Sequence, residues 1–190
     1  MWLYCYDLLL TCHSRPTEFK YHAFVIYSNE DKLWMKTKLL TLLEEKHHLT
    51  CCVHYRNFEL GIPFRDNMAN SVYKSYKVIA LFSSNFLRSN YCKYELDIAI
   101  GRLLQKRDRS LIVIRIDEAD CAELPPELKQ RSFIDYCDIL ERPLWKRKLL
   151  GFLGLPEDSE THEATRDQSN CCENITFGFN GMPVTNKNGV

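Results

Sequence analysis

Short apolar segments alternate with longer amphipathic segments over residues 20–156. The apolar segments are rich in β-branched and aromatic residues, and their length is typical of buried strands. Strands that are apolar on both faces and alternate with helices predict a parallel sheet that is covered on both sides. The pattern therefore predicts an α/β domain with an open five-stranded parallel sheet and helices on both faces. The predicted strands are residues 21–28, 49–55, 77–82, 110–116 and 133–136.

The segments between these strands carry helix signals. Leu33, Leu40 and Leu43 recur at helical spacing after an acidic first turn. The longest helix is predicted over residues 91–104, with one apolar face formed by Cys92, Leu96, Ala99 and Leu103. In doubly wound sheets, ligands bind at the loops that follow the carboxyl ends of the strands. The predicted helices are residues 29–46, 66–73, 91–104 and 145–153.

Two flanking segments differ in composition from this central domain. Residues 1–19 form an apolar lead followed by a polar hinge, and residues 157–190 form a polar tail. The tail has too few apolar residues to offset the entropy of ordering it, so we expect it to be disordered. Asn174 lies in a triplet that matches a glycosylation acceptor, which we interpret as accidental in a cytosolic chain.

The first twelve residues, MWLYCYDLLLTC, are mostly apolar but too short to span a bilayer. They have no basic start and no small-residue cleavage site, so they do not resemble a complete secretory signal. Two interpretations remain open. The segment is either a short amphipathic stretch that packs on the domain, or the cytosolic end of a truncated transmembrane helix.

Composition excludes several classes of protein. The chain has 25 Lys and Arg against 25 Asp and Glu, so its formal charge is zero and it lacks the basic excess of a duplex-binding protein. We therefore expect no nucleic-acid partner. Its nine cysteines show no C-x-x-C spacing, which argues against a zinc ribbon or a thioredoxin-type motif. Free thiols in a reducing compartment are the expected state.

Most enzyme motifs are missing from the sequence. It has no G-x-G-x-x-G and no G-x-x-x-x-G-K, so neither a Rossmann dinucleotide site nor a P-loop is supported. His47, His48 and His54 lack companions at the spacing of metal ligands. We therefore expect no metal and no bound cofactor.

Four segments, taken in order, resemble the boxes of Toll/interleukin-1 receptor (TIR) domains. The resemblance covers about residues 20–153 and is most like the intracellular domain of Toll-like receptors. It implies a flavodoxin-like TIR fold on the cytosolic side of a membrane receptor. A membrane anchor, missing or truncated in this sequence, is left open. The matching segments are YHAFVIYSNED (21–31), RNFELG (56–61), SSNF with NYCKYEL (83–86 and 90–96), and LW (144–145) in place of Phe-Trp.

The second box departs from the pattern of Toll-like receptors, which usually reads Arg-Asp-x-x-Pro-Gly. Here Asn57 replaces the Asp and Leu60 replaces the Pro, while Pro63 follows three residues later. Pro63 fixes its own φ and biases Ile62 towards extended geometry, so it stiffens the loop at a different point. The altered box leaves open whether the chain activates signalling or acts as a decoy.

The resemblance implies a module that pairs with itself and with adaptor TIR domains in innate immune signalling. The implied partner-binding residues lie in an exposed loop that combines apolar and charged side chains, as suits a reversible interface. The alternative is that Phe58, Leu60 and Ile62 fold back onto the following helix. The partner-binding candidates are Arg56, Asn57, Phe58, Glu59, Leu60, Gly61, Ile62 and Pro63.

Some TIR domains cleave NAD with one glutamate on the third helix, and Glu95 matches that position. A carboxylate there could stabilise an oxocarbenium-like state, as in glycoside cleavage. Glu95 borders the inward face of its helix, where burial would raise its pKa. Signalling TIR domains also carry this glutamate, so an NAD glycohydrolase with NAD as substrate stands as the alternative function. A structural glutamate, capped or in a salt bridge, is the third interpretation.

Overall fold

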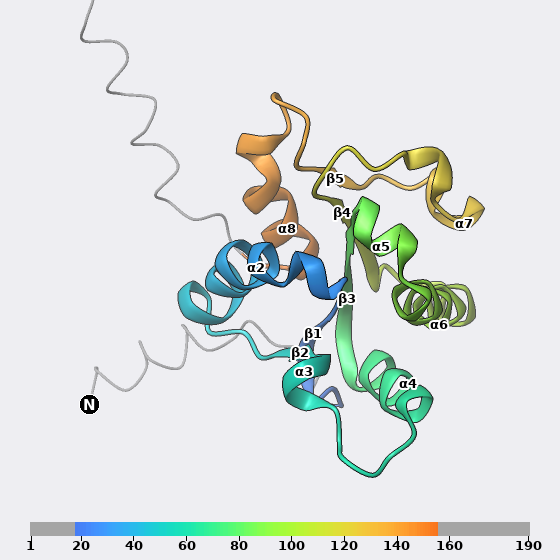
Figure 1. Ribbon diagram of the computed structural model, residues 1–190. Coiled ribbons are helices and arrows are strands. Elements are labelled where there is room, and N and C mark those ends of the chain that lie inside the picture. The colour runs from blue at the N-terminus through green and yellow to red at the C-terminus, as the bar shows by residue number, and fades with distance from the viewer. Residues whose placement is uncertain (1–17, 156–190) are drawn as a thin grey trace, which may run out of the picture. The chain divides into compact units, whose positions relative to one another are not determined.

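The computed structural model describes residues 18–155, which form one five-stranded parallel sheet between two layers of helices (Figure 1). The strand order is β2-β1-β3-β4-β5, and every neighbouring pair is parallel. This confirms the predicted α/β fold. The strands are β1 (Tyr21–Ile26), β2 (Cys51–Val53), β3 (Ser75–Phe82), β4 (Leu111–Arg115) and β5 (Ile134–Asp135).

Helices connect the strands and cover both faces of the sheet. Three short segments are 3-10 turns, namely η1 (Asn29–Asp31), η3 (Cys121–Glu123) and η4 (Arg142–Leu144). The helices are α2 (Lys32–Trp34), the π-helix η2 (Met35–Lys46), α3 (His54–Asn57), α4 (Phe64–Lys74), α5 (Ser84–Arg88), α6 (Asn90–Lys106), α7 (Pro126–Lys129) and α8 (Trp145–Leu153).

Two hydrophobic cores lie on opposite faces of the sheet because alternate strand residues point in opposite directions. In β1, Ala23 and Val25 pack with η2 and α8, whereas Phe24 and Ile26 pack with α4 and α6. In Figure 1 the sheet is seen nearly edge-on, with α2 and α8 on one side and α4 and α6 on the other. The predicted apolar face of α6 is buried in the second core.

The boundaries differ from the predictions in a few places. β2 ends at Val53, because His54–Asn57 turn into the short helix α3. Leu33 recurs at helical spacing with Leu40 and Leu43, but it is 74% exposed, and the neighbouring Trp34 and Met35 face the core instead. The expectations for the apolar lead before residue 18, for the polar tail and for Asn174 lie outside the described residues.

The strand order creates a topological switch point between β1 and β3. From β1 the chain crosses to β2 on one side, and from β3 it continues to β4 on the other. The loops that leave the carboxyl ends of β1 and β3 therefore run to opposite faces and open a crevice between them. The fold places a candidate ligand site at this point.

Candidate functional site

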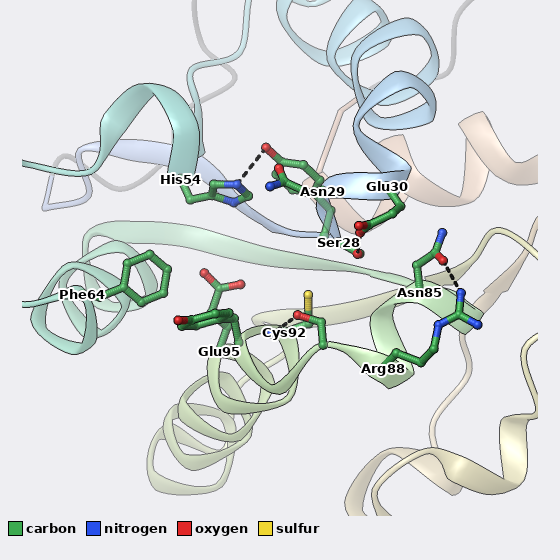
Figure 2. Close-up of a pocket in the computed structure, with 12 residues that line it drawn as sticks. Ser28, Asn29, Glu30, His54, Phe64, Asn85, Arg88, Cys92 and Glu95 are labelled. Atoms are coloured by element: carbon green, nitrogen blue, oxygen red, sulfur yellow. Dashed lines mark hydrogen bonds between the residues drawn. The ribbon is translucent and has the colours of Figure 1, made fainter.

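A cavity of about 690 Å³ lies at this switch point. Its walls come from the segments after β1, β2 and β3 and from the first turns of α4 and α6 (Figure 2). Its size falls within the range of small-molecule sites. The lining residues are Tyr27, Ser28, Asn29, Glu30, His54, Phe64, Asn85, Arg88, Ser89, Tyr91, Cys92 and Glu95.

Glu95 projects from α6 into this cavity, and its side chain is only 2% exposed (Figure 2). Within the described part of the chain, no group hydrogen-bonds to its carboxyl and no cation pairs with it. Burial disfavours the charged form and raises the pKa of Glu95 to about 8. The structure therefore shows neither a cap nor a salt bridge for Glu95 within residues 18–155. Because perturbed, unpaired carboxyls in clefts are typical of functional sites, Glu95 is the strongest candidate for chemistry here.

Tyr27 and His54 form the opposite wall of the cavity. Their rings stack with centroids 4.5 Å apart, and the Tyr27 hydroxyl lies 3.3 Å from Nε2 of His54. Burial and the nearby Lys32 ammonium lower the pKa of His54, so its imidazole is neutral at pH 7. Burial likewise raises the pKa of the Tyr27 hydroxyl. The wall facing Glu95 thus offers uncharged hydrogen-bonding groups.

A hydrogen-bonded chain organises the polar end of the cavity. Asp31, which is buried, accepts hydrogen bonds from the Ser83 hydroxyl and from the Asn85 amide. The Asn85 side-chain oxygen in turn accepts a bond of 2.6 Å from Arg88. Ser83 also caps α5 through the Phe86 amide. The loops after β1 and β3 are therefore tied together, and the Arg88 guanidinium is held at the rim.

Aromatic side chains connect the cavity rim to the loop after α3. Phe58 stacks on Phe24 of the second core and contacts Phe64 edge-on, with centroids 5.2 Å apart. Phe64 contacts Tyr91 in the same way at 5.1 Å. Phe58 therefore folds back onto the domain, as in the alternative given above for the loop. It is half-buried and packs against the second core.

Arg56 and Asn57 hold the base of the loop. The Arg56 guanidinium pairs with Glu44 of η2 at 2.6 Å and donates to the Cys51 carbonyl. The Asn57 side chain accepts from the Val53 amide at 2.9 Å. The pair with Arg56 also lowers the pKa of Glu44, although partial burial opposes the shift. Arg56 and Asn57, which are partner-binding candidates, thus make their polar contacts within the domain.

The outer part of the loop presents Leu60, which is fully exposed. The side chain of Asn67 in α4 braces the loop through two hydrogen bonds of 2.9 Å. Its oxygen accepts from the Glu59 amide, and its nitrogen donates to the Glu59 carbonyl. Gly61 has a φ of +80°, which other residues adopt only with strain. Ile62 is half-buried, and exposed Pro63 accepts the first backbone bonds of α4. The sequence did not single out Asn67, although an Asn four residues after a loop Pro is a signal for such a brace.

Candidate metal ligands do not cluster in this domain. Over residues 18–155, no group of three or more His, Cys, Asp or Glu side chains is placed to hold a metal ion. The cysteines of the same stretch are all free thiols, and burial raises the pKa of Cys92 in the cavity wall to about 12. That thiol is therefore not a nucleophile at neutral pH.

Comparison with known families identifies the fold. Residues 23–149 match the TIR domain family along most of the described chain. The chain belongs to the TIR domain family. The sequence resemblance stated above is thereby confirmed.

The relatives of this TIR domain include Toll-like receptors. It is 38% identical over 130 residues to Toll-like receptor 6 of Dasypus novemcinctus, and 36% identical over 130 residues to human Toll-like receptor 1. Each alignment covers 68% of this chain but only 16% of the relative, so the chain spans about one sixth of the length of these receptors. In residues 18–155, no helix combines the length and apolar character needed to cross a bilayer.

Solved TIR domains share the fold. The TIR domain of a Toll-related receptor from Hydra magnipapillata superposes with a TM-score of 0.62 at 24% identity, covering 71% of this chain and 99% of that one. A TIR-STING receptor from C. gigas, solved with 2',3'-cGAMP, also has a TM-score of 0.62 at 24% identity, over 75% of this chain and 42% of that one. At this identity the likeness concerns the fold alone.

Proposed function

We propose that this TIR domain signals by associating with further copies of itself and with adaptor TIR domains, and that the outer loop around Leu60 makes the contact. The observation that carries the proposal is a fully exposed leucine on a braced loop. Exposed apolar side chains surrounded by polar ones are typical of interaction sites. Because the Asn67 brace already orders the loop, binding loses little conformational entropy.

Fewer loop residues are proposed to contact the partner than the eight candidates named from the sequence. Arg56, Asn57 and Phe58 stabilise the domain through Glu44, the β2 backbone and the aromatic contacts with Phe24. Substituting them would disturb folding and binding together. The contact surface is therefore assigned to Glu59, Leu60 and Gly61, with Pro63 at its edge.

Photo-crosslinking at position 60 tests this assignment. With p-benzoylphenylalanine in place of Leu60, we expect crosslinked dimers in a purified, concentrated sample, because the side chain lies in the contact. The matched control carries the same group at Leu33, which is exposed on a different helix. Crosslinks of equal yield from both positions would remove the loop from the interface.

Cleavage of NAD is a second candidate function, supported by the buried, unpaired carboxyl of Glu95 in a cavity of suitable size. In this reaction the bond between nicotinamide and ribose breaks, and neutral nicotinamide leaves with the bonding electrons. Water then adds to the ribose carbon and releases one proton to the solvent. An ionised Glu95 would stabilise the positive charge that develops on the ribose. Arg88 at the rim would attract the phosphates.

An NAD-consumption assay on the clustered chain tests this candidate. The reaction needs ionised Glu95, so turnover should rise with pH up to about 8, by roughly tenfold per unit in the acidic range. Glu95→Ala should abolish it, and circular dichroism should show an unchanged fold. Absence of nicotinamide release at pH 8 would leave association as the only candidate function.

A further inference from the structure

The connection between β5 and α8 exposes two adjacent aliphatic side chains at its tip. Ile139 is 82% exposed and Leu140 is 81% exposed. This connection projects beyond the sheet in Figure 1. The aliphatic tip, as we call Ile139 and Leu140, lies far along the chain from the loop around Leu60 and has no part in the proposed association.

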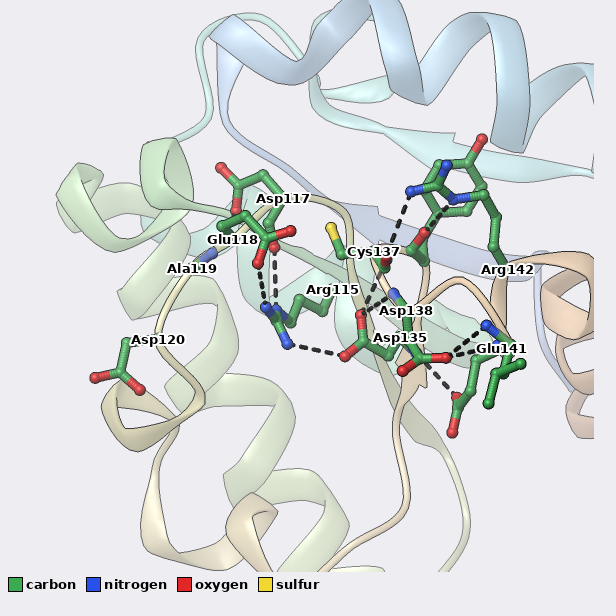
Figure 3. Close-up of polar contacts among 12 residues, drawn as sticks. Arg115, Asp117, Glu118, Ala119, Asp120, Asp135, Cys137, Asp138, Glu141 and Arg142 are labelled. Carbon is green, nitrogen blue, oxygen red and sulfur yellow. Dashed lines mark hydrogen bonds and ion pairs between the residues drawn. The ribbon is translucent and has the colours of Figure 1, made fainter.

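The backbone around the aliphatic tip is ordered by polar contacts (Figure 3). The Asp138 carboxylate accepts from the amides of Leu140 and Glu141 at 2.7 and 2.9 Å. Arg142 donates to the Tyr136 and Cys137 carbonyls at 2.8 and 3.3 Å. The turn therefore has an ordered backbone, and this backbone holds the Ile139 and Leu140 side chains out in the solvent.

The carboxylates near the tip are engaged by other groups of the domain. Asp135 pairs with Arg115 at 2.8 Å (Figure 3). Glu141 pairs with Lys148 of α8 at 2.6 Å. Asp138 is occupied by the backbone amides of the turn. Asp135 and Glu141 are therefore paired with cations, whereas Asp138 keeps its negative charge and uses its hydrogen bonds to shape the turn.

The helices α2, η2 and α8, which cover one face of the sheet, are rich in basic residues. Together α2, η2 and α8 carry seven Lys and Arg residues against two Glu, and α8 contains no acidic residue. Lys146 and Arg147 are exposed in the first turn of α8, directly after the tip. The basic residues are Lys32, Lys36, Lys38, Lys46, Lys146, Arg147 and Lys148.

We propose that the aliphatic tip inserts into an anionic lipid surface while Lys146 and Arg147, the exposed basic residues of α8, contact its headgroups. Charge complementarity argues for this occupant, since basic residues beside exposed aliphatic side chains are the pattern of interfacial membrane binding. The shape agrees, because two aliphatic side chains at the end of a projecting turn can enter a lipid surface without a larger contact area around them. A fluid lipid surface requires no matching groove.

Sedimentation of the full chain with vesicles tests the proposal. We expect binding to phosphatidylcholine vesicles that contain phosphatidylserine, weaker binding at high salt, and little binding to phosphatidylcholine alone. Ile139→Asp with Leu140→Asp should reduce the partition coefficient about tenfold. Lys146→Gln should reduce it about fivefold, on anionic vesicles only.

The control variant, Leu60→Asp with Leu104→Asp, makes the same change of charge at exposed leucines elsewhere on the domain. It should keep vesicle binding although it removes the proposed association contact, so the two ideas can fail separately. Equal vesicle binding by the tip variant and the control would overturn the proposal. So would a tip variant that keeps vesicle binding but loses self-association in sedimentation velocity, since the tip would then be a protein interface.

Discussion

Replacing Glu95 by Gln should stabilise the domain, and the gain should grow by about 3 kcal/mol between pH 5 and pH 8. Burial raises the pKa of Glu95 to about 8 in the folded chain, from an ordinary value of 4.5. Below pH 4.5 the carboxyl is neutral in both states. Between pH 4.5 and 8 the unfolded chain loses the proton and the folded chain keeps it, so unfolding becomes easier as pH rises. Because Gln does not titrate in this range, the free energy of unfolding of the variant does not fall for this reason.

Chemical denaturation of both proteins across this pH range measures the effect. Asp97→Asn is the matched control, because it removes an exposed carboxylate from the same helix and should change stability by less than about 0.5 kcal/mol. A stability difference between Glu95→Gln and the unsubstituted chain that stays constant from pH 5 to pH 8 would show that Glu95 is already ionised when folded.

Replacing Arg102 by Met should destabilise the domain by about 3 kcal/mol. Arg102 is 1% exposed and donates hydrogen bonds to the carbonyls of Val72, Ser75 and Tyr76. These carbonyls lie where α4 ends and β3 begins, so the guanidinium joins three elements through one side chain. Met fills similar volume but leaves all three carbonyls buried without this donor.

Lys93→Met is the control for Arg102→Met, because Lys93 is exposed on the same helix and its loss should change stability little. Thermal and urea unfolding measure both variants. A loss of less than about 1 kcal/mol for Arg102→Met would mean that water or backbone movement replaces its hydrogen bonds.

The fold was largely predictable because the strands are apolar on both faces. Runs such as residues 77–82 predict buried parallel strands, and the intervening helix patterns predict a sheet covered on both faces. The strand order itself comes from the structure. The end of β2 was not predictable in the same way. His54 and Tyr55 continue the β-like pattern, but the pairing of Arg56 with Glu44, twelve residues earlier, accompanies a turn of helix there.

The candidate site was only partly predictable. Helical spacing placed Glu95 at the border of the buried face of α6, but its lack of a partner depends on residues from several distant elements. Phe58 reads as an exposed aromatic in a loop, yet it packs on Phe24 because the loop returns over β1. Long-range contacts of this kind leave no local pattern in the sequence.

Titration of the purified chain over a surface densely coated with the same chain tests the association claim most directly. The dense surface matters because weak contacts are strengthened by effective concentration. We expect saturable binding that Leu60→Asp weakens at least about tenfold and that Leu33→Asp leaves unchanged. No binding at any density, or equal binding by Leu60→Asp and the unsubstituted chain, would contradict it.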